Sequence, residues 1–409
     1  MTRESPRPAW GLFGHRGFAA VFLAHSVSQL GDRIHQLALA WWTMATTGSV
    51  GWTGAVLIAT TLPTVLLSPV AGTLADRMDR RTLMMASDVA RAVVAGALAG
   101  LAWRGQLTVV VLMAASALLA ALTTLFTPAA LAVTPTLVPE DKVLPATSLM
   151  ESSVQGAALA GPVLGGVVVA ALGAAGAFGL NAASFLVSAL LLLAVPRRPV
   201  ALAGGHEPFR AAAAGGFRFL RHDRTVAGVL VCFAAVNVFT MPVLLFMPYF
   251  ASQVFGVGAT GLGWMEAALG LGMLGAAVFW ASRGRATSPF PVVTGGLLGV
   301  AAAVAVMGLW PRYPVHLASL VAAGAAMGSV NVVVVAWFQT RVPPSEAGRF
   351  FGLMTSLASG LIPVSYGIFG VIGERLSPAW LLTGNAAAIA AIAGALALVP
   401  GFRDVRPST

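Results

Sequence analysis

The chain alternates long apolar stretches with short polar breaks along almost its whole length. A helix needs about 20 apolar residues to cross the roughly 30 Å hydrocarbon core of a membrane. Stretches of about that length lie at 17–46, 51–75, 82–103, 107–126, 147–172, 176–195, 225–250, 260–281, 291–310, 315–338, 349–372 and 378–399. The pattern therefore predicts an all-α membrane protein with twelve transmembrane helices.

Composition and charge support this prediction. Of the 409 residues, 58% are hydrophobic and only 9% are charged, whereas about a quarter are charged in soluble domains. Most Lys and Arg residues fall in alternate breaks, which by the positive-inside rule places both termini in the cytoplasm of a cell membrane. The net charge of +10 is thus a topology signal, and we expect contact with membrane lipid but no nucleic-acid partner.

The longest polar break divides the chain into halves that echo each other at a constant offset of 204 residues. Pairs related by this offset include Pro139 with Pro343, Met150 with Met354, and Asn181 with Asn385. We therefore expect two six-helix bundles, 1–195 and 225–409, joined by a cytoplasmic linker at 196–224. Six helices per half give both halves the same orientation, related by a pseudo-two-fold axis along the membrane normal. A shared cavity would lie between them.

A charged motif occupies the break between the second and third predicted helices. Its residues are Gly72, Asp76, Arg77, Arg80 and Arg81. This spacing resembles the loop signature of the major facilitator superfamily, with Asp79 where glycine is usual. The resemblance implies a cytoplasmic latch in which Asp76 and the arginines bridge neighbouring helix ends. Simple positive-inside anchoring explains the arginines but not Gly72 and Asp76 at their spacing.

Asp88 and Arg91 stand three residues apart in the third predicted helix. This i, i+3 spacing favours a pair that supports the latch over a contact with substrate.

The fifth predicted helix carries a second motif, formed by Gly161, Pro162, Gly165 and Gly166. It resembles the Gly-Pro-x-x-Gly-Gly signature of the superfamily's exporters. Ordinary small-residue packing between helices would also use these residues. The resemblance favours an antiporter.

Further stretches resemble one branch of the superfamily, the drug:proton antiporters that include macrolide-efflux proteins and enterobactin exporters. They are SQLGD at 28–32, PTLVP at 135–139, NAASFL at 181–186, GFRFL at 216–220 and QTRVP at 339–343. In this order they indicate the branch, but they do not indicate a substrate.

Charged residues inside predicted spans are costly to insert and normally face a cavity. Asp32 lies midway along the first span, where a desolvated carboxyl could exchange a proton; a structural ion pair is the alternative. Glu266, and His35 on the same face as Asp32, are further proton-coupling candidates. The expected substrate cavity comprises Asp32, Arg33, Gln36, Asn237, Asn331 and Glu266. The polar members could instead bridge helices.

We predict proton-coupled efflux of lipophilic drugs such as macrolides, cationic ones included, by a monomer. A siderophore or lysolipid exporter on the same fold is the alternative, and a non-transporting receptor is left open. The only lysine, Lys142, follows Asp141, so a Gly-Lys-Ser/Thr phosphate loop is absent, and no His-Glu-x-x-His site occurs. We therefore expect no enzyme, no cofactor and no metal.

Overall fold

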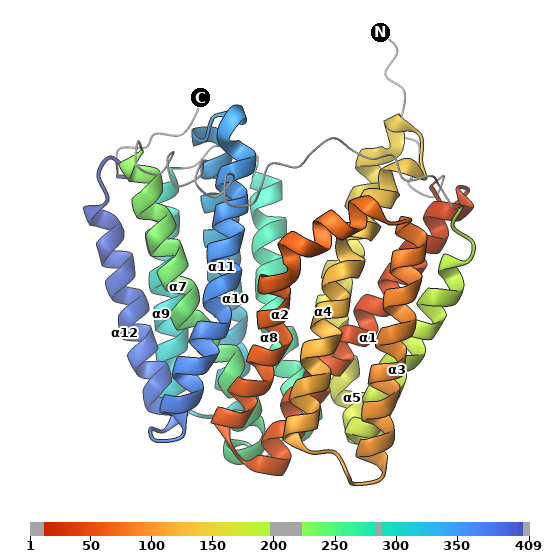
Figure 1. Ribbon diagram of the computed structural model, residues 1–409. Helices are drawn as coiled ribbons and strands as arrows, with labels where there is room; N and C mark the ends of the chain where they lie inside the picture. Colours follow the sequence, from red (N-terminus) through yellow and green to blue (C-terminus); the bar gives the residue numbers. More distant parts are fainter. Residues whose placement is uncertain (1–11, 197–222, 284–287, 404–409) are drawn as a thin grey trace. The chain divides into compact units, whose positions relative to one another are not determined.

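The computed structural model describes residues 12–196, 223–283 and 288–403, and this part of the chain is helical without strands. The first five long helices are α1 (Arg16–Thr47), α2 (Val50–Arg77), α3 (Arg80–Trp103), α4 (Val109–Val133) and α5 (Val143–Leu192). Those of the second half are α7 (Arg224–Tyr249), α8 (Gly258–Arg283), α9 (Pro289–Leu309), α10 (Tyr313–Arg341), α11 (Pro344–Gly373) and α12 (Pro378–Ala395) (Figure 1). Four short helical turns accompany them: η2 (Thr134–Thr136), η3 (Glu140–Lys142), the π-helical η4 (Phe250–Val254) and η5 (Leu396–Leu398). The predicted linker, 196–224, lies outside the described residues except at its ends.

Ten helical segments of the described chain are long and apolar enough to cross a membrane. One of them, Glu140–Leu192, covers two predicted spans and is interrupted at Gly173, whose φ of 68° belongs to the left-handed region that favours glycine. The helix α1 is not among the ten, since it carries Asp32, Arg33 and two histidines among its apolar residues. An all-helical membrane fold is thus confirmed, with ten clear candidates for membrane spans.

Local chemistry explains where several helices begin. The side chain of Asp79 accepts a hydrogen bond from the backbone of Thr82 and caps α3, and Asp223 caps α7 in the same way. The helices α9 to α12 each have proline in their first turn, where a missing N–H costs nothing. Asp79, which departs from the family's loop signature, therefore has a structural role as a helix cap.

Contacts divide the chain into two compact units. Unit 1 comprises residues 1–39 and 62–206, and unit 2 comprises 40–61 and 207–409. The end of α1 and the first part of α2 thus group with the C-terminal helices. The predicted bundle limits do not include this exchange, and they stay a prediction.

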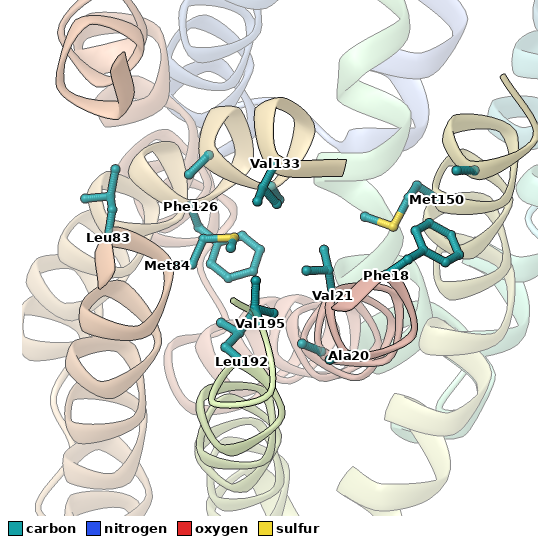
Figure 2. Packing of buried hydrophobic residues seen from close by; sticks show 14 of the residues in the cluster. Phe18, Ala20, Val21, Leu83, Met84, Phe126, Val133, Met150, Leu192 and Val195 are labelled. Atoms are coloured by element: carbon teal, nitrogen blue, oxygen red, sulfur yellow. The ribbon is translucent and has the colours of Figure 1, made fainter. Parts of the chain in front are cut away.

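Unit 1 has an apolar core at one end of its helices. Phe18 and Val21 of α1, Met84 of α3, Phe126 of α4 and Met150 of α5 meet there (Figure 2). In the same unit, α3 packs along both α4 and α5. This packing holds the polar residues of α1, α3 and α5 in register with one another.

Unit 2 is held together by close helix contacts at small residues. A Cβ atom on Gly272 of α8 would lie 2.1 Å from the carbonyl oxygen of Val321 on α10. A Cβ atom on Gly324 of α10 would lie equally close, 2.1 Å, to the carbonyl oxygen of Leu269 on α8. Glycine at both positions lets the two backbones touch, which is how membrane helices gain packing energy without a hydrophobic driving force.

Unit 2 also contains the contact between the start of α2 and the end of α11. A Cβ atom on Gly54 would lie 2.8 Å from the carbonyl oxygen of Tyr366. One turn beyond the glycine contacts, Glu374 Oε1 accepts hydrogen bonds from Ser49 Oγ at 2.6 Å and from the backbone N–H of Gly51 at 2.7 Å. The carboxylate therefore satisfies a free donor at the N-terminus of α2, where negative charge is favourable.

Candidate functional site

Three charged side chains of unit 1 form a cluster inside the helices. Asp88 and Arg91, both on α3, form the predicted i, i+3 ion pair. Arg91 Nη1 also lies 3.7 Å from Asp32 Oδ2 on α1, a pairing that the sequence did not predict. The side chains of Arg91 and Asp88 are 1% and 0% exposed, whereas that of Asp32 is 23% exposed. Asp32 is thus the only one of these three charged residues whose side chain is partly exposed.

The environment of Arg91 explains how a cation is tolerated there. Its guanidinium carbon lies 4.6 Å from the ring centre of Phe126 on α4 and 4.3 Å from that of Phe185 on α5. A desolvated cation–π contact contributes about 2 kcal/mol. On the acidic side, Ser188 Oγ donates a hydrogen bond of 2.6 Å to Asp88 Oδ2. Ion pairing, ring faces and a hydroxyl together offset the cost of taking these charges out of water.

Further residues beside Asp32 were missed as site residues. Asn181 of α5 lies within interacting distance of the Asp32 carboxylate, and its buried Nδ2 makes no hydrogen bond within the described residues. A Cβ atom on Gly31 would lie 2.2 Å from Ser184 Oγ, so glycine is what lets α1 approach α5 here. The signal for Asn181 was present in the sequence, since Asn181 is one of the residues repeated at the 204-residue offset. The repeat did not indicate that Asn181 lies beside Asp32.

The other predicted residues of α1 take separate positions. Arg33 Nη1 donates to Gln36 Oε1 at 3.3 Å, on the same helix. His35 is buried with its ring centre 4.8 Å from that of Phe178, and neither ring nitrogen has a hydrogen-bond partner among the described residues. The structure therefore does not join His35 to Asp32.

The predicted antiporter motif packs directly against this part of α1. A Cβ atom on Gly161 would lie 2.3 Å from Arg33 Cβ, and one on Gly165 would lie 3.2 Å from Ile34 Cα. Pro162 and Gly166 are buried in the same stretch of α5. The motif thus sets the distance between α5 and the turn of α1 that follows Asp32.

Only part of the predicted loop latch can be placed. Gly72, Asp76 and Arg77 stand at the end of α2, and their side chains lie outside the described part of the structure. Arg80 Nη1 donates to the backbone oxygen of Ala132 at 2.8 Å, and this bond ties the start of α3 to the end of α4. Arg81 is half-buried. The bridging role of Asp76 stays a prediction.

A pocket lies within unit 2, between α7, α9, α10 and η5. It holds about 540 Å³ of unfilled space, part of it open to the outside. Asn237 of α7 and Asn331 of α10, two of the predicted cavity residues, line it, and so does Cys232, the only cysteine of the chain. Glu266 is elsewhere in unit 2, half-buried on α8 and close enough to Tyr366 of α11 to interact with it electrostatically. The structure therefore brings together the two asparagines, but not Glu266.

Among the residues that the structure describes, one titratable group outside the membrane-spanning segments, Glu374, has a clearly altered pKa. The hydrogen bonds from Ser49 Oγ and from the backbone N–H of Gly51 favour the charged form of Glu374 and lower its pKa. The contact between α2 and α11 consequently depends on the charge of one exposed carboxylate.

The chain matches a family model described as transmembrane secretion effector over residues 7–405. It is 29% identical over 385 residues to the uncharacterized MFS-type transporter YfiS of Bacillus subtilis, covering 90% of this chain and 88% of that protein. It is 28% identical over 384 residues to the multidrug efflux pump Tap of Mycobacterium tuberculosis, covering 88% of each. It is also 25% identical to the enterobactin exporter EntS of Escherichia coli O1:K1, covering 89% of this chain and 87% of the exporter.

Solved structures share the fold at low sequence identity. The nucleoside transporter NupG matches with a TM-score of 0.74 and 12% identity, covering 94% of this chain and 99% of that one. A bacterial homologue of the iron transporter ferroportin, in an inward-facing state, matches with a TM-score of 0.70 and 16% identity, covering 94% and 98%. These likenesses concern the arrangement of helices alone.

Proposed function

The chain belongs to the transmembrane secretion effector family of the major facilitator superfamily, and on that premise we propose that it expels lipophilic drugs in exchange for protons. It is a transport protein and not an enzyme. Relatives named as a multidrug efflux pump and as a siderophore exporter support outward transport of small molecules. Macrolides and lipophilic cations are the substrates that we expect.

We propose that transport uses twelve membrane helices and alternating access. The ten apolar segments become twelve membrane helices when α1 is added and Glu140–Leu192 is divided at Gly173. With both termini in the cytoplasm, most basic residues lie on the cytoplasmic side, as the positive-inside rule requires. In this arrangement the substrate cavity is reached from one side of the membrane at a time.

The observation that carries the proposed proton coupling is the unequal exposure of the charge cluster. Asp88 and Arg91 are closed off, while the Asp32 carboxylate, 3.7 Å from Arg91, is partly open. A proton arriving on Asp32 would remove its charge and weaken its attraction to Arg91, leaving Arg91 to Asp88 alone. Because α1 and α3 each contribute one side of this contact, protonation of Asp32 would favour one arrangement of the two helices over another.

Arg33 and Gln36 are proposed to take part in substrate binding on the same helix as Asp32, and Glu266 is proposed as a separate proton-coupling acid within unit 2. A lipophilic cation would be attracted by Asp32 only while Asp32 is charged. Proton binding and cation binding then exclude each other, which is the requirement for antiport.

The test replaces Asp32 by Asn in the full-length protein, reconstituted in proteoliposomes. We expect D32N to lose uphill movement of ethidium and erythromycin driven by a proton gradient. Exchange of labelled for unlabelled substrate needs no proton, so it should persist in D32N, but at a higher substrate concentration because the attraction for a cation is weakened. The matched control is Glu151→Gln, because Glu151 is an exposed acid of unit 1 whose side chain accepts a hydrogen bond from Gln155 of its own helix and from no other described residue. If D32N still drives substrate uphill, Asp32 is not the coupling residue.

An anionic siderophore is the second candidate substrate, favoured by the likeness to the enterobactin exporter. Such a substrate needs basic groups in the cavity, yet Arg91 is paired with two acids and Arg33 is bonded to Gln36. Both arginines are thus already engaged, which favours a neutral or cationic substrate. Transport of enterobactin but not of ethidium by the same proteoliposomes would reverse this order.

A further inference from the structure

The unit 2 pocket is lined almost entirely by apolar side chains. They come from the middle of α7, the first half of α9, the second half of α10 and the turn after α12. Its lining consists of Val229, Cys232, Phe233, Val236, Asn237, Thr240, Val293, Leu297, Met327, Val330, Asn331, Val334 and Leu396. No charged side chain is present among these lining residues.

Two amide groups supply the polarity that a ligand can use in this pocket, because the hydroxyl of Thr240, which also lines it, donates to the backbone oxygen of Val236. Asn237 Nδ2 donates to the backbone oxygen of Phe233 at 2.9 Å, which leaves Oδ1 as an acceptor without a partner in the described structure. Asn331 is exposed, and its amide makes no hydrogen bond to any described residue. The pocket therefore offers both donors and acceptors, but no charge to neutralise an ion. A ligand that carries a charge would lose its hydration without compensation here.

The pocket falls on the same sequence positions as the charge cluster of unit 1. At the 204-residue offset, Asp32 corresponds to Val236, Phe126 to Val330, and Arg91 to Gly295. His25, which stacks on Phe126 in unit 1, corresponds to Val229. Each change removes charge or bulk from unit 2, and three of the four replacements line the pocket. The space that unit 1 fills with charged and aromatic side chains is thus left open in unit 2.

From this geometry we propose that the unit 2 pocket is a binding site for an uncharged lipophilic molecule of one or two rings with a hydrogen-bonding group. Phe233 and the aliphatic walls hold the rings, and Asn237 and Asn331 hold the polar group. This site goes beyond the proton-coupled exchange proposed above, because all of its walls belong to unit 2 and its occupancy does not require Asp32.

The lone cysteine makes the site measurable in the unaltered protein. Cys232 lines the pocket and is half-buried, so a bound molecule shields its thiol. The experiment measures the rate at which N-ethylmaleimide modifies Cys232 in the purified full-length protein, with 1-naphthol as the uncharged probe. At about ten times its Kd, 1-naphthol should slow the modification about tenfold, because only the empty fraction reacts. Tetraphenylphosphonium, a lipophilic cation, should not slow it.

Variants of α10 locate the effect. Val330→Phe restores the ring found at the corresponding position of unit 1 and should abolish the protection. Asn331→Leu removes only the amide and should weaken 1-naphthol binding about two- to tenfold, the effect of one lost hydrogen bond. Val321→Phe is the matched control, because Val321 lies on the same helix, is 40% exposed and does not line the pocket. D32N should keep full protection.

Equilibrium dialysis of 1-naphthol against the same variants gives a second reading if Cys232 reacts slowly. Saturable binding that is weakened in Asn331→Leu and kept in Val321→Phe supports the site. The proposal is overturned if the wild-type protein does not bind 1-naphthol. It is also overturned if binding is unchanged in both Val330→Phe and Asn331→Leu, or if binding is lost in D32N. Because proton coupling is judged by D32N transport alone, the two proposals can fail separately.

Discussion

Unit 1 fills the space between its helices with charges and rings, whereas unit 2 leaves the corresponding positions small and neutral. In unit 1, Arg91 is held by Asp32, Asp88 and two aromatic rings. In unit 2, glycine stands at the position of Arg91, and a pocket with two asparagines remains. A buried charge must be enclosed by partners, since its desolvation is otherwise too costly. A neutral amide can be left open to receive a ligand.

The largest effect on stability is expected from removing Arg91, the buried cation of unit 1. Arg91→Met leaves the Asp88 carboxyl buried without its main partner, which should cost about 3–5 kcal/mol of stability. Thermal unfolding of the purified protein in detergent measures the loss. The control is Arg341→Met, because the exposed pair of Arg341 with Asp223 in unit 2, 2.9 Å apart, should be worth no more than about 1 kcal/mol. The double variant with Asp88→Asn should recover part of the lost stability; a further loss would contradict the pairing.

A smaller effect is expected from the hydroxyl that holds Asp88. Ser188 is fully buried and donates to the carboxylate, and a hydrogen bond to a charged group is worth about 1.5–3 kcal/mol. Ser188→Ala should lower the unfolding temperature accordingly. Ile392 occupies the corresponding position in unit 2, so Ile392→Val serves as a conservative control with a cost of about 1 kcal/mol. Equal losses in the two variants would show that Asp88 does not depend on Ser188.

Two glycine-to-alanine substitutions compare the tight packing around Gly31 in unit 1 with the open surroundings of Gly295 in unit 2. Gly31→Ala places a methyl group 2.2 Å from Ser184 Oγ and should destabilise unit 1 by about 1–3 kcal/mol. Gly295→Ala in unit 2 meets no atom within 4 Å, so it should be neutral or should stabilise α9 by up to about 1 kcal/mol. The melting temperature should therefore fall in Gly31→Ala and stay the same or rise in Gly295→Ala. A loss in Gly295→Ala as large as that in Gly31→Ala would contradict the difference in packing.

The smallest effect concerns an exposed acid, Glu374, in contrast to the buried Asp88. Glu374→Gln removes a charge at the N-terminus of α2, a contribution of about 0.3–1 kcal/mol that solvent and salt reduce further. Because its folded-state pKa is lowered, the charged contact stabilises fully above the ordinary carboxyl pKa and is lost as pH falls through the lowered value. The melting difference between wild type and Glu374→Gln should therefore be present at pH 7, begin to shrink near the ordinary glutamate pKa of about 4.3 and disappear as pH falls through the lowered value. A difference that grows on acidification would contradict this sign.

The helices were predictable because each carries its own signal. The stretch predicted at 225–250 became Arg224–Tyr249, and the gap between the predicted spans 147–172 and 176–195 fell on the left-handed Gly173. The predicted span at 107–126 was too short, since α4 continues to Val133 through Pro128. Hydropathy locates the apolar stretch, but it does not indicate how far the helix continues beyond that stretch.

The site was only partly predictable, for a related reason. The Asp88–Arg91 pair follows from spacing within one helix, so the sequence indicated it. The contact of Arg91 with Asp32 depends on how α1 packs against α3, which no local pattern records. The pocket was harder to predict from the sequence. It forms where side chains are small, and small side chains at scattered positions form no recognisable motif. Only the structure showed that Val229, Val236 and Val330, which stand at the positions of His25, Asp32 and Phe126, line one pocket.

The buried Asp88–Arg91 pair also bears on how the protein is made. On insertion scales, an arginine or aspartate at the centre of a helix costs about 2.5–3.5 kcal/mol, so α3 enters the bilayer at a disadvantage. Ser188, which completes the site of Asp88, follows it by 100 residues. At a translation rate of about 5–20 residues per second, Ser188 is synthesised roughly 5–20 seconds after Asp88. During this interval Asp32 of α1, which is synthesised before α3, is already available as a partner for Arg91.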